Sequence, residues 1–361
     1  MPLDEALLTP EVLNNTLARQ VFPEVRIVPG TAPKMGKVRT VYDIGKKGGG
    51  DLLLMVSSDN LSTHDVVHKR RVYGKGGNLD EISSHFFELA WEALHLSNHY
   101  IETVGPNAWI VQKAQPILVE MVLRACLTGS GWKAYEKADG PRTGMDFCGV
   151  HLRPGYHKNE RLDQVIVTPT AKGQVKDFPT LKFPGLGSED DDPPVTLDMI
   201  RNNYQAFGLR EQEDLDIIVD DARRLYDFIS KKLAATGNLL ADTKWEFGYL
   251  SDGTIALIDE CVTPDSSRFW SLEHYKYDPE KGLFIAVQHD KQPFRDHIEE
   301  LGLHKDKARL AAYEMPYEEI RKGVIRYGDM REAITGTKML ITTDPVRERV
   351  IAALDKRGML K

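Results

Sequence analysis

The residues best suited to chemistry lie between positions 239 and 260, where charged side chains interrupt an otherwise apolar sequence. Asp242, Lys244 and Glu246 recur there at every second position. Side chains alternate between the two faces of a β-strand, so a strand would bring all three onto one face. One strand would then direct two carboxylates and an amine toward a single site.

An Asp252–Gly253 dipeptide marks a hairpin in the same segment, because this pair suits a two-residue turn with positive φ. If these two residues form the loop, Glu246 lies directly opposite Asp259 on the returning strand. Opposed carboxylates repel each other by up to about 1 kcal/mol at an exposed site, which favours a cation between them. Mg²⁺ is held by one or two carboxylates, phosphate oxygens and water, so we interpret the two acids as magnesium ligands. The alternative is an exposed hairpin rim, which the apolar character of both strands argues against.

Two further segments carry arginines that suit phosphate or carboxylate groups. Arg124 lies in an apolar stretch before a Thr-Gly-Ser-Gly loop that contains Ser130. A partly buried arginine needs a partner, and small residues let backbone N–H groups approach an anion. Arg268 ends a turn-forming run and offers a planar fork of donors. A strand-to-helix turn, and an arginine stacked on Trp270, remain structural alternatives for these two segments.

A third group of cations lies near the N-terminus. A strand over Lys34–Ile44 would place Lys37 and Arg39 on one face, with Val38 and Tyr42 on the other. Cations on an inward face would meet phosphates. The segment lacks the Gly-Lys-Ser/Thr run of a Walker A motif, so by itself it also fits an exposed edge strand.

The elements that must position these residues indicate an α+β chain of two domains. At 361 residues and 41% hydrophobic composition, the chain exceeds what one hydrophobic core usually serves. We expect a smaller domain at residues 1–115 and a larger one at 116–361, with Pro116 as the hinge, and a loop or insertion around residues 173–194. The expected strands are Asp51–Ser57, Ala108–Ala114 and Ile117–Ala125, and the expected helices are Leu79–Leu96 and Asp214–Ala235, the second ending at Gly237.

Composition excludes several classes of protein. A formal net charge of -7 argues against a partnership with nucleic acid or an anionic membrane surface. No stretch approaches the roughly 18 apolar residues that span a bilayer, and no signal peptide pattern is present. The three cysteines form no Cys-x-x-Cys pair, so neither a disulfide framework nor a thiolate zinc site is indicated. We therefore expect a cytoplasmic protein.

Taken together and in this order, the segments resemble the SAICAR synthetase family, the phosphoribosylaminoimidazole-succinocarboxamide synthases. The match runs from about Gly36 to Leu301, and its specificity comes from several motifs in register. The motifs are Gly-Lys-Val-Arg-x-x-Tyr-Asp at 36, Ser-x-x-Asp at 62, Gly-Lys-Gly at 74, Leu-Thr-Gly-Ser-Gly-Trp-Lys at 127, Leu-Ala-Asp-Thr-Lys-x-Glu-Phe-Gly at 240, Ile-Asp-Glu at 258, Thr-Pro-Asp-Ser-Ser-Arg-Phe-Trp at 263 and Asp-Lys-Gln-x-x-Arg-Asp at 290.

The resemblance implies a reaction in which ATP, carboxyaminoimidazole ribonucleotide and L-aspartate give the succinocarboxamide, ADP and phosphate. It implies ATP and Mg²⁺ as cofactors, and a two-domain fold of antiparallel sheets with flanking helices, related to ATP-grasp enzymes and kinases. It leaves open whether the chain forms a homo-oligomer. A carboxylate acylates an amine only after phosphorylation has made its oxygen a leaving group. Cations neutralise the charge that develops during phosphoryl transfer, and the lysines, arginines and proposed magnesium ligands of this chain suit that task.

Carried over by position, the resemblance divides the candidate residues into four groups. The nucleotide-binding group is Gly36, Lys37, Arg39, Lys113 and Glu120. The magnesium ligands are Glu246 and Asp259. The substrate-binding group is Ser62, Asp65, Lys75, Arg124, Ser130, Arg268, Lys291 and Arg295. The residues close to the reacting groups are Asp242, Lys244 and Asp265, of which the first is our candidate for removing the amine proton.

Departures from the family pattern motivate an alternative function. Residues 58–65 carry Asn60 and His64 where the family has an arginine and an aromatic residue, and the stretch after Lys172 lacks a His-Asp-Glu run. The alternative is a related ATP-dependent phosphotransferase or ligase acting on a different small anionic acceptor. A nucleotide-binding protein without catalysis is a third interpretation, which the acidic pair and the lysines disfavour.

Overall fold

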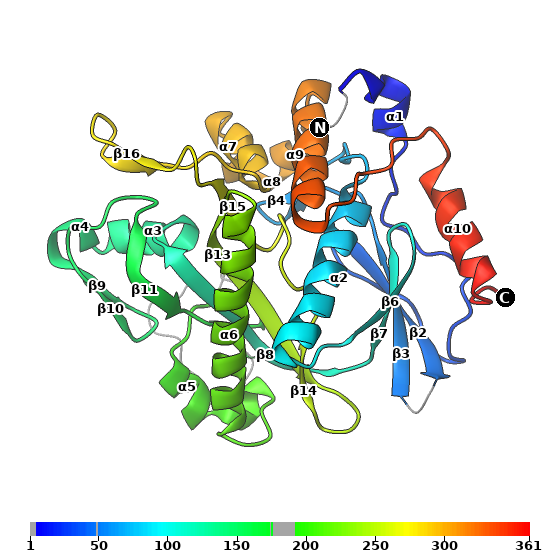
Figure 1. Cartoon of the computed structure of the whole chain (residues 1–361), viewed down its shortest axis with the longest axis horizontal. Coiled ribbons are helices and arrows are strands. Elements are labelled where there is room, and N and C mark those ends of the chain that lie inside the picture. Colours follow the sequence, from blue (N-terminus) through cyan, green and yellow to red (C-terminus); the bar gives the residue numbers. More distant parts are fainter. Residues whose placement is uncertain (1–4, 48–49, 174, 176–191) are drawn as a thin grey trace.

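Two antiparallel sheets with flanking helices form the frame of the molecule in the computed structural model (Figure 1), which describes residues 5–47, 50–173, 175 and 192–361. The mixed architecture agrees with the predicted α+β class. The predicted insertion at residues 173–194 lies mostly outside the described residues. Within the described part of the chain, no helix is long and apolar enough to cross a membrane.

The first sheet has five strands in the order β1-β2-β3-β7-β6. The prediction of one strand over Lys34–Ile44 is wrong, because the chain folds back at Gly36, whose N–H donates to the Arg39 carbonyl at 2.8 Å. Lys37 therefore lies in a turn, and Arg39 begins the next strand. The strands are β1 (Lys34–Met35), β2 (Arg39–Lys47), β3 (Gly50–Ser57), β6 (Tyr100–Gly105) and β7 (Ala108–Gln112), with a small separate hairpin of β4 (Ser62–Thr63) and β5 (Val66–Val67).

The second sheet is built around its longest strands, β8 and β13, which pair with each other. Pro116, the predicted hinge, lies inside β8, where it pairs with Gly248. On the far side of β8 lie β11 and β12, and β13 also pairs with β14 and β15. The bounds are β8 (Gln115–Cys126), β11 (Arg161–Val167), β12 (Thr170–Ala171), β13 (Asn238–Tyr249), β14 (Ile255–Ile258) and β15 (Arg268–Ser271).

Two long helices join the sheets into one core. The first, α2 (Lys75–Leu94), packs on β3, β6 and β7, and α6 (Asp214–Ala235) packs on β8 and β13. The predicted bounds of α6 are confirmed, and Gly237 follows its end with a φ of 78°. One continuous cluster of buried side chains includes Trp109 of the first sheet and Trp245 of the second. The division at residues 115 and 116 stays a prediction.

The C-terminal helices return to the N-terminal half of the chain (Figure 1), where α9 (Tyr317–Thr335) packs on α2 and α10 (Val346–Lys356) on β6. A buried cluster accordingly joins Val350 and Leu354 of α10 to Phe22 and Tyr42. The remaining elements are α1 (Pro10–Asn14), α3 (Gly129–Lys137), α4 (Gly140–Thr143), β9 (Met145–Phe147), β10 (Val150–Leu152), α5 (Leu197–Asn202), β16 (Lys276–Asp278), β17 (Leu283–Ile285), α7 (Gln292–Glu300), α8 (Lys307–Ala312) and the 3₁₀ turns Glu5–Leu7, Tyr204–Phe207 and Leu303–Lys305.

Candidate active site

The β13–β14 hairpin differs from its predicted register by one residue. Glu246 pairs with Ile258, so the prediction that it lies directly opposite Asp259 is wrong. The reason is the loop, which holds five residues, 250–254, between the paired Tyr249 and Ile255. Asp259 follows β14 with a φ of 62°, and its carboxylate accepts a hydrogen bond from Arg39 at 2.6 Å. The two acids still lie close enough for Asp259 to raise the pKa of Glu246.

The carboxylate that does oppose Glu246 belongs to Glu120 on β8. Lys172 bridges this pair, with its Nζ 2.7 Å from Glu120 Oε1 and 2.6 Å from Glu246 Oε1. Lys244 adds a second cation, 2.8 Å from the same Glu120 oxygen. A cation thus separates two opposed carboxylates, as electrostatics requires, but it is a lysine that sequence reasoning missed. Its position at the end of a Thr-Pro-Thr-Ala-Lys run, directly after β12, was the available signal.

The pKa values of these two glutamates are shifted in opposite directions. Burial and the neighbouring Asp259 raise the pKa of Glu246 to about 7, against the effect of Lys172. Burial also opposes ionisation of Glu120, but Lys244 and Lys172 together hold its pKa below the ordinary value. Glu246 therefore holds a proton more readily than Glu120 does.

The acidic pair fits Mg²⁺ in its donor chemistry. Across the described ranges, no group of three or more His, Cys, Asp or Glu side chains is placed to hold a metal ion, and the acidic pair offers two carboxylates. Mg²⁺ accepts such a set, because substrate phosphates and water complete its octahedron. In this structure Arg39 forms an ion pair with Asp259, and Lys172 forms one with Glu246.

A cavity of about 230 Å³ brings the largest group of predicted residues together. Its centre is Asp242, which accepts from Arg124 at 3.2 Å and from Arg268 at 2.5 Å. A shift in the register of β13 between Leu240 and Asp242 places Asp242 level with both arginines. The predicted residues that line the cavity are Glu120, Arg124, Ser130, Asp242, Lys244, Asp265, Arg268 and Arg295.

The cavity is shaped to hold arginine side chains close to a backbone loop. Arg124 donates to Ser130 Oγ at 3.1 Å and to Thr168 Oγ1 at 2.9 Å. At Gly129, which has a φ of 55°, an added Cβ would lie 2.4 Å from a guanidinium nitrogen of Arg268. Two arginines share one carboxylate here, so the group formed by Arg124, Arg268 and Asp242 carries a net positive charge that suits an anionic ligand.

A second acid of the cavity, Asp265, holds one buried and one partly buried lysine. Lys75 Nζ lies 2.7 Å and Lys291 Nζ 3.2 Å from its Oδ2 atom, and the Lys75 side chain is fully buried. Burial raises the pKa of Asp265, but the two lysines more than offset this and hold it well below its usual range. Tyr327 of α9 donates to the other oxygen at 2.7 Å, and sequence reasoning did not find it.

Other predicted residues lie away from this cavity. Lys37 and Asp65 pair with each other at the surface, and Ser62 lies in the small β4–β5 hairpin. Lys113 pairs with Asp43 and is half exposed. Gly36 occupies the β1–β2 turn. Arg39 alone of the candidates from the first sheet reaches the second-sheet acids, contacting Asp259 and Glu260. The functional roles of these residues stay predictions.

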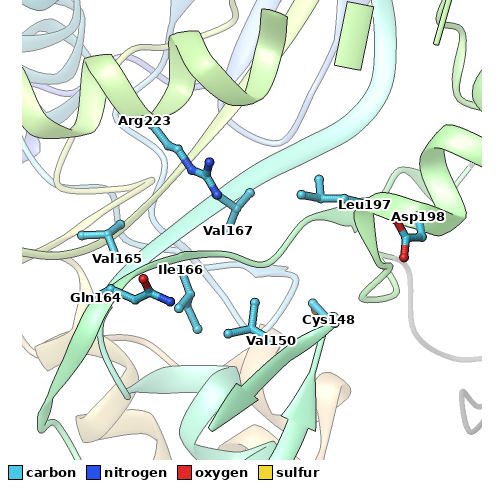
Figure 2. Close-up of a pocket in the computed structure, with 10 residues that line it drawn as sticks. Cys148, Val150, Gln164, Val165, Ile166, Val167, Leu197, Asp198 and Arg223 are labelled. Carbon is cyan, nitrogen blue, oxygen red and sulfur yellow. The ribbon is translucent and has the colours of Figure 1, made fainter. Parts of the chain in front are cut away.

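A separate, larger cavity of about 430 Å³ contains none of the predicted residues. Figure 2 shows Arg223 of α6 pointing into it from one side, toward Val167 of β11. Cys148 and Val150 of the β9–β10 hairpin lie on the opposite side. This cavity shares no lining residue with the cavity that contains Asp242.

Two antiparallel sheets with flanking helices define an α+β protein, and its cavity of paired arginines and acids suits anionic ligands. The SAICAR synthetase family matches residues 33–310. The phosphoribosylaminoimidazole-succinocarboxamide synthase of Saccharophagus degradans is 31% identical over 368 residues, covering 92% of this chain and 96% of that protein. The synthase of Vibrio cholerae is 32% identical over 355 residues, covering 89% and 92%. The chain belongs to the SAICAR synthetase family, whose members are ATP-dependent carbon–nitrogen ligases of purine biosynthesis.

Solved structures show the same fold. SAICAR synthase from Saccharomyces cerevisiae in complex with SAICAR has a TM-score of 0.66 at 24% identity, covering 89% of this chain and 98% of that chain. A SAICAR synthetase in complex with ADP has a TM-score of 0.58 at 23% identity, covering 86% and 100%. The predicted fold is thus confirmed, while its relation to ATP-grasp enzymes and kinases stays a prediction.

Proposed function

We propose that this chain joins L-aspartate to the carboxylate of carboxyaminoimidazole ribonucleotide, consuming ATP and releasing SAICAR, ADP and phosphate. The observation that carries the proposal is the cavity in which Asp242 orients Arg124 and Arg268. Asp242 lies on the same strand, β13, as Glu246. A residue that holds the anion-binding arginines and a proposed metal ligand therefore share one rigid strand. Membership in the family supplies the reaction.

Arg124, Arg268 and Ser130 are proposed to bind the phosphate of the ribonucleotide. The guanidinium groups present planar pairs of donors, and such pairs match the oxygens of a phosphate. The Ser130 hydroxyl lies at the start of α3, where backbone N–H groups add to the favourable field. Asp242 holds both arginines in place, which favours a role in orienting them over a role as the base for the amine.

Glu246 and Asp259 are proposed to hold Mg²⁺ with the phosphates of ATP. When bound, the metal neutralises charge on the transferring phosphoryl group. Arg39 and Lys172, which contact these carboxylates in the structure, become available to phosphate oxygens once a metal takes their place. Lys244, next to Glu120 and the cavity, adds positive charge on the substrate side.

The order of events follows from the chemistry of carboxylates. The substrate carboxylate attacks the terminal phosphorus of ATP, and ADP leaves. The amine of L-aspartate then attacks the activated carbon, an amide bond forms, and phosphate departs with the oxygen. The contribution of this chain is to align the reactants and to supply fixed charge, which lowers the barrier without reorganisation. A cytoplasmic location is part of the proposal, supported by the absence of disulfides among the described cysteines.

A phosphate-release assay tests the proposal. ATP, Mg²⁺, the imidazole ribonucleotide and L-aspartate are supplied together, and each is then omitted in turn. We expect phosphate release to require all four, with formation of SAICAR in equal amount. Release of ADP that needs the ribonucleotide but ignores aspartate would favour the alternative phosphotransferase and overturn the proposal.

A further inference from the structure

The C-terminal part of the chain contributes a side chain to the active site. Tyr327 lies on α9, beyond residues 33–310 that match the family. Its hydroxyl donates to Asp265 Oδ1 at 2.7 Å, and the side chain is almost completely buried. Asp265 lines the 230 Å³ cavity. A tyrosine from outside the matched residues therefore contacts an acid that lines the cavity.

The two oxygens of Asp265 have different partners. Oδ2 accepts from Lys75 and Lys291, whereas Oδ1 accepts from Tyr327. The carboxylate is thus held from both sides, and its rotation about the Cβ–Cγ bond is restricted. Without the tyrosine hydroxyl, a buried anionic oxygen would lose its hydrogen bond, and the carboxylate could turn away from one lysine.

Tyr327 and Lys75 belong to one packed unit. Lys75 begins α2, and its Nζ lies 5.8 Å from the centre of the Tyr327 ring. One turn further along α9, Arg331 donates to Asn78 on the first turn of α2 at 3.4 Å. The beginning of α2 is therefore fastened to α9 beside Asp265. These contacts place the tyrosine hydroxyl relative to both lysines.

We propose that Tyr327 is a positioning residue for the ligase reaction. It orients Asp265 in the wall of the cavity proposed to receive the anionic acceptor substrates, the ribonucleotide and aspartate, and through Asp265 it fixes Lys75 and Lys291 behind that wall. The inference rests on the proposed function and deepens it. It assigns a role in the reaction to α9, which follows residues 33–310 matched by the family.

The test compares Tyr327→Phe with Tyr42→Phe in the full-length enzyme. Both changes remove one buried hydroxyl that makes one hydrogen bond, and the Tyr42 hydroxyl accepts from the Phe22 N–H in a cluster away from the cavity. For Tyr327→Phe we expect the KM of the ribonucleotide or of aspartate to rise about tenfold. We expect the KM of ATP to change less than twofold. Tyr42→Phe should leave every KM unchanged.

A double-mutant cycle separates positioning from packing. If Tyr327 acts through Asp265, its removal should have no further effect on KM in an Asp265→Asn background. Unchanged KM values in Tyr327→Phe, or losses that equal those of Tyr42→Phe, would overturn the inference while leaving the proposed function intact. If Asp265→Asn does not fold, the comparison of the two tyrosine variants still decides. Wild-type enzyme without SAICAR formation would instead overturn the proposed function itself.

Discussion

Replacing Lys172 by methionine removes the cation between Glu120 and Glu246 and keeps a side chain of similar length. Loss of one partner from a buried ion pair costs about 3 to 5 kcal/mol. The side chains of Lys172 and Glu246 are 23% and 21% exposed, and Glu120 keeps its contact with Lys244. Solvent and the second lysine reduce the penalty, so we expect a loss of about 2 kcal/mol in the free energy of unfolding.

The assay is chemical denaturation with ADP alone and with ADP plus Mg²⁺. A ligand that binds only the folded state stabilises it. If Mg²⁺ replaces Lys172 at Glu246, the difference in the free energy of unfolding between the wild type and Lys172→Met should therefore be smaller when the metal is present. Lys322→Met is the control, since Lys322 makes one exposed pair with Glu319 at 2.9 Å and should change stability by less than about 0.5 kcal/mol. Equal losses in the two variants, or a Lys172→Met loss that ignores Mg²⁺, would refute the reasoning.

Three further predictions concern the same cavity and hairpin. Glu246→Gln and Asp259→Asn should each lower kcat by about 100-fold or more while the protein stays folded; near-normal turnover in both would exclude the metal assignment. Arg268→Ala should raise the KM for the ribonucleotide far more than that for ATP in steady-state kinetics, and equal effects would count against a role in phosphate binding. Gly129→Ala should weaken ribonucleotide binding by calorimetry, because the new Cβ would lie 2.4 Å from Arg268; unchanged affinity would contradict the close approach.

Local sequence patterns predicted the elements well where the signal repeats along the chain. Apolar residues at three- and four-residue spacing predicted α6 over Asp214–Ala235, and the structure has it at those residues. Alternation along β13 placed Asp242 and Lys244 on the wall of one cavity. The helix and strand periods are set by neighbours in the chain, and a single sequence records them directly.

Register and long-range partners were not predictable in this way. A turn does form at Asp252–Gly253, but its loop is longer than the predicted two residues. The cross-strand partner of Glu246 is therefore Ile258 and not Asp259. A register shift of one residue cannot be predicted from local sequence patterns, because the register depends on how the strands pack. The turn at Gly36 likewise interrupted a stretch whose alternation suggested a single strand.

The sequence by itself determined which charged residues this protein has, their spacing along strands and helices, and its membership in a family of ligases. The tertiary structure decided which charges meet. Lys172 lies between Glu120 and Glu246, and Tyr327 reaches Asp265 across 62 residues of chain. The physical reason is that ion pairs and hydrogen bonds depend on distances of a few ångströms, and the folding of the whole chain sets those distances.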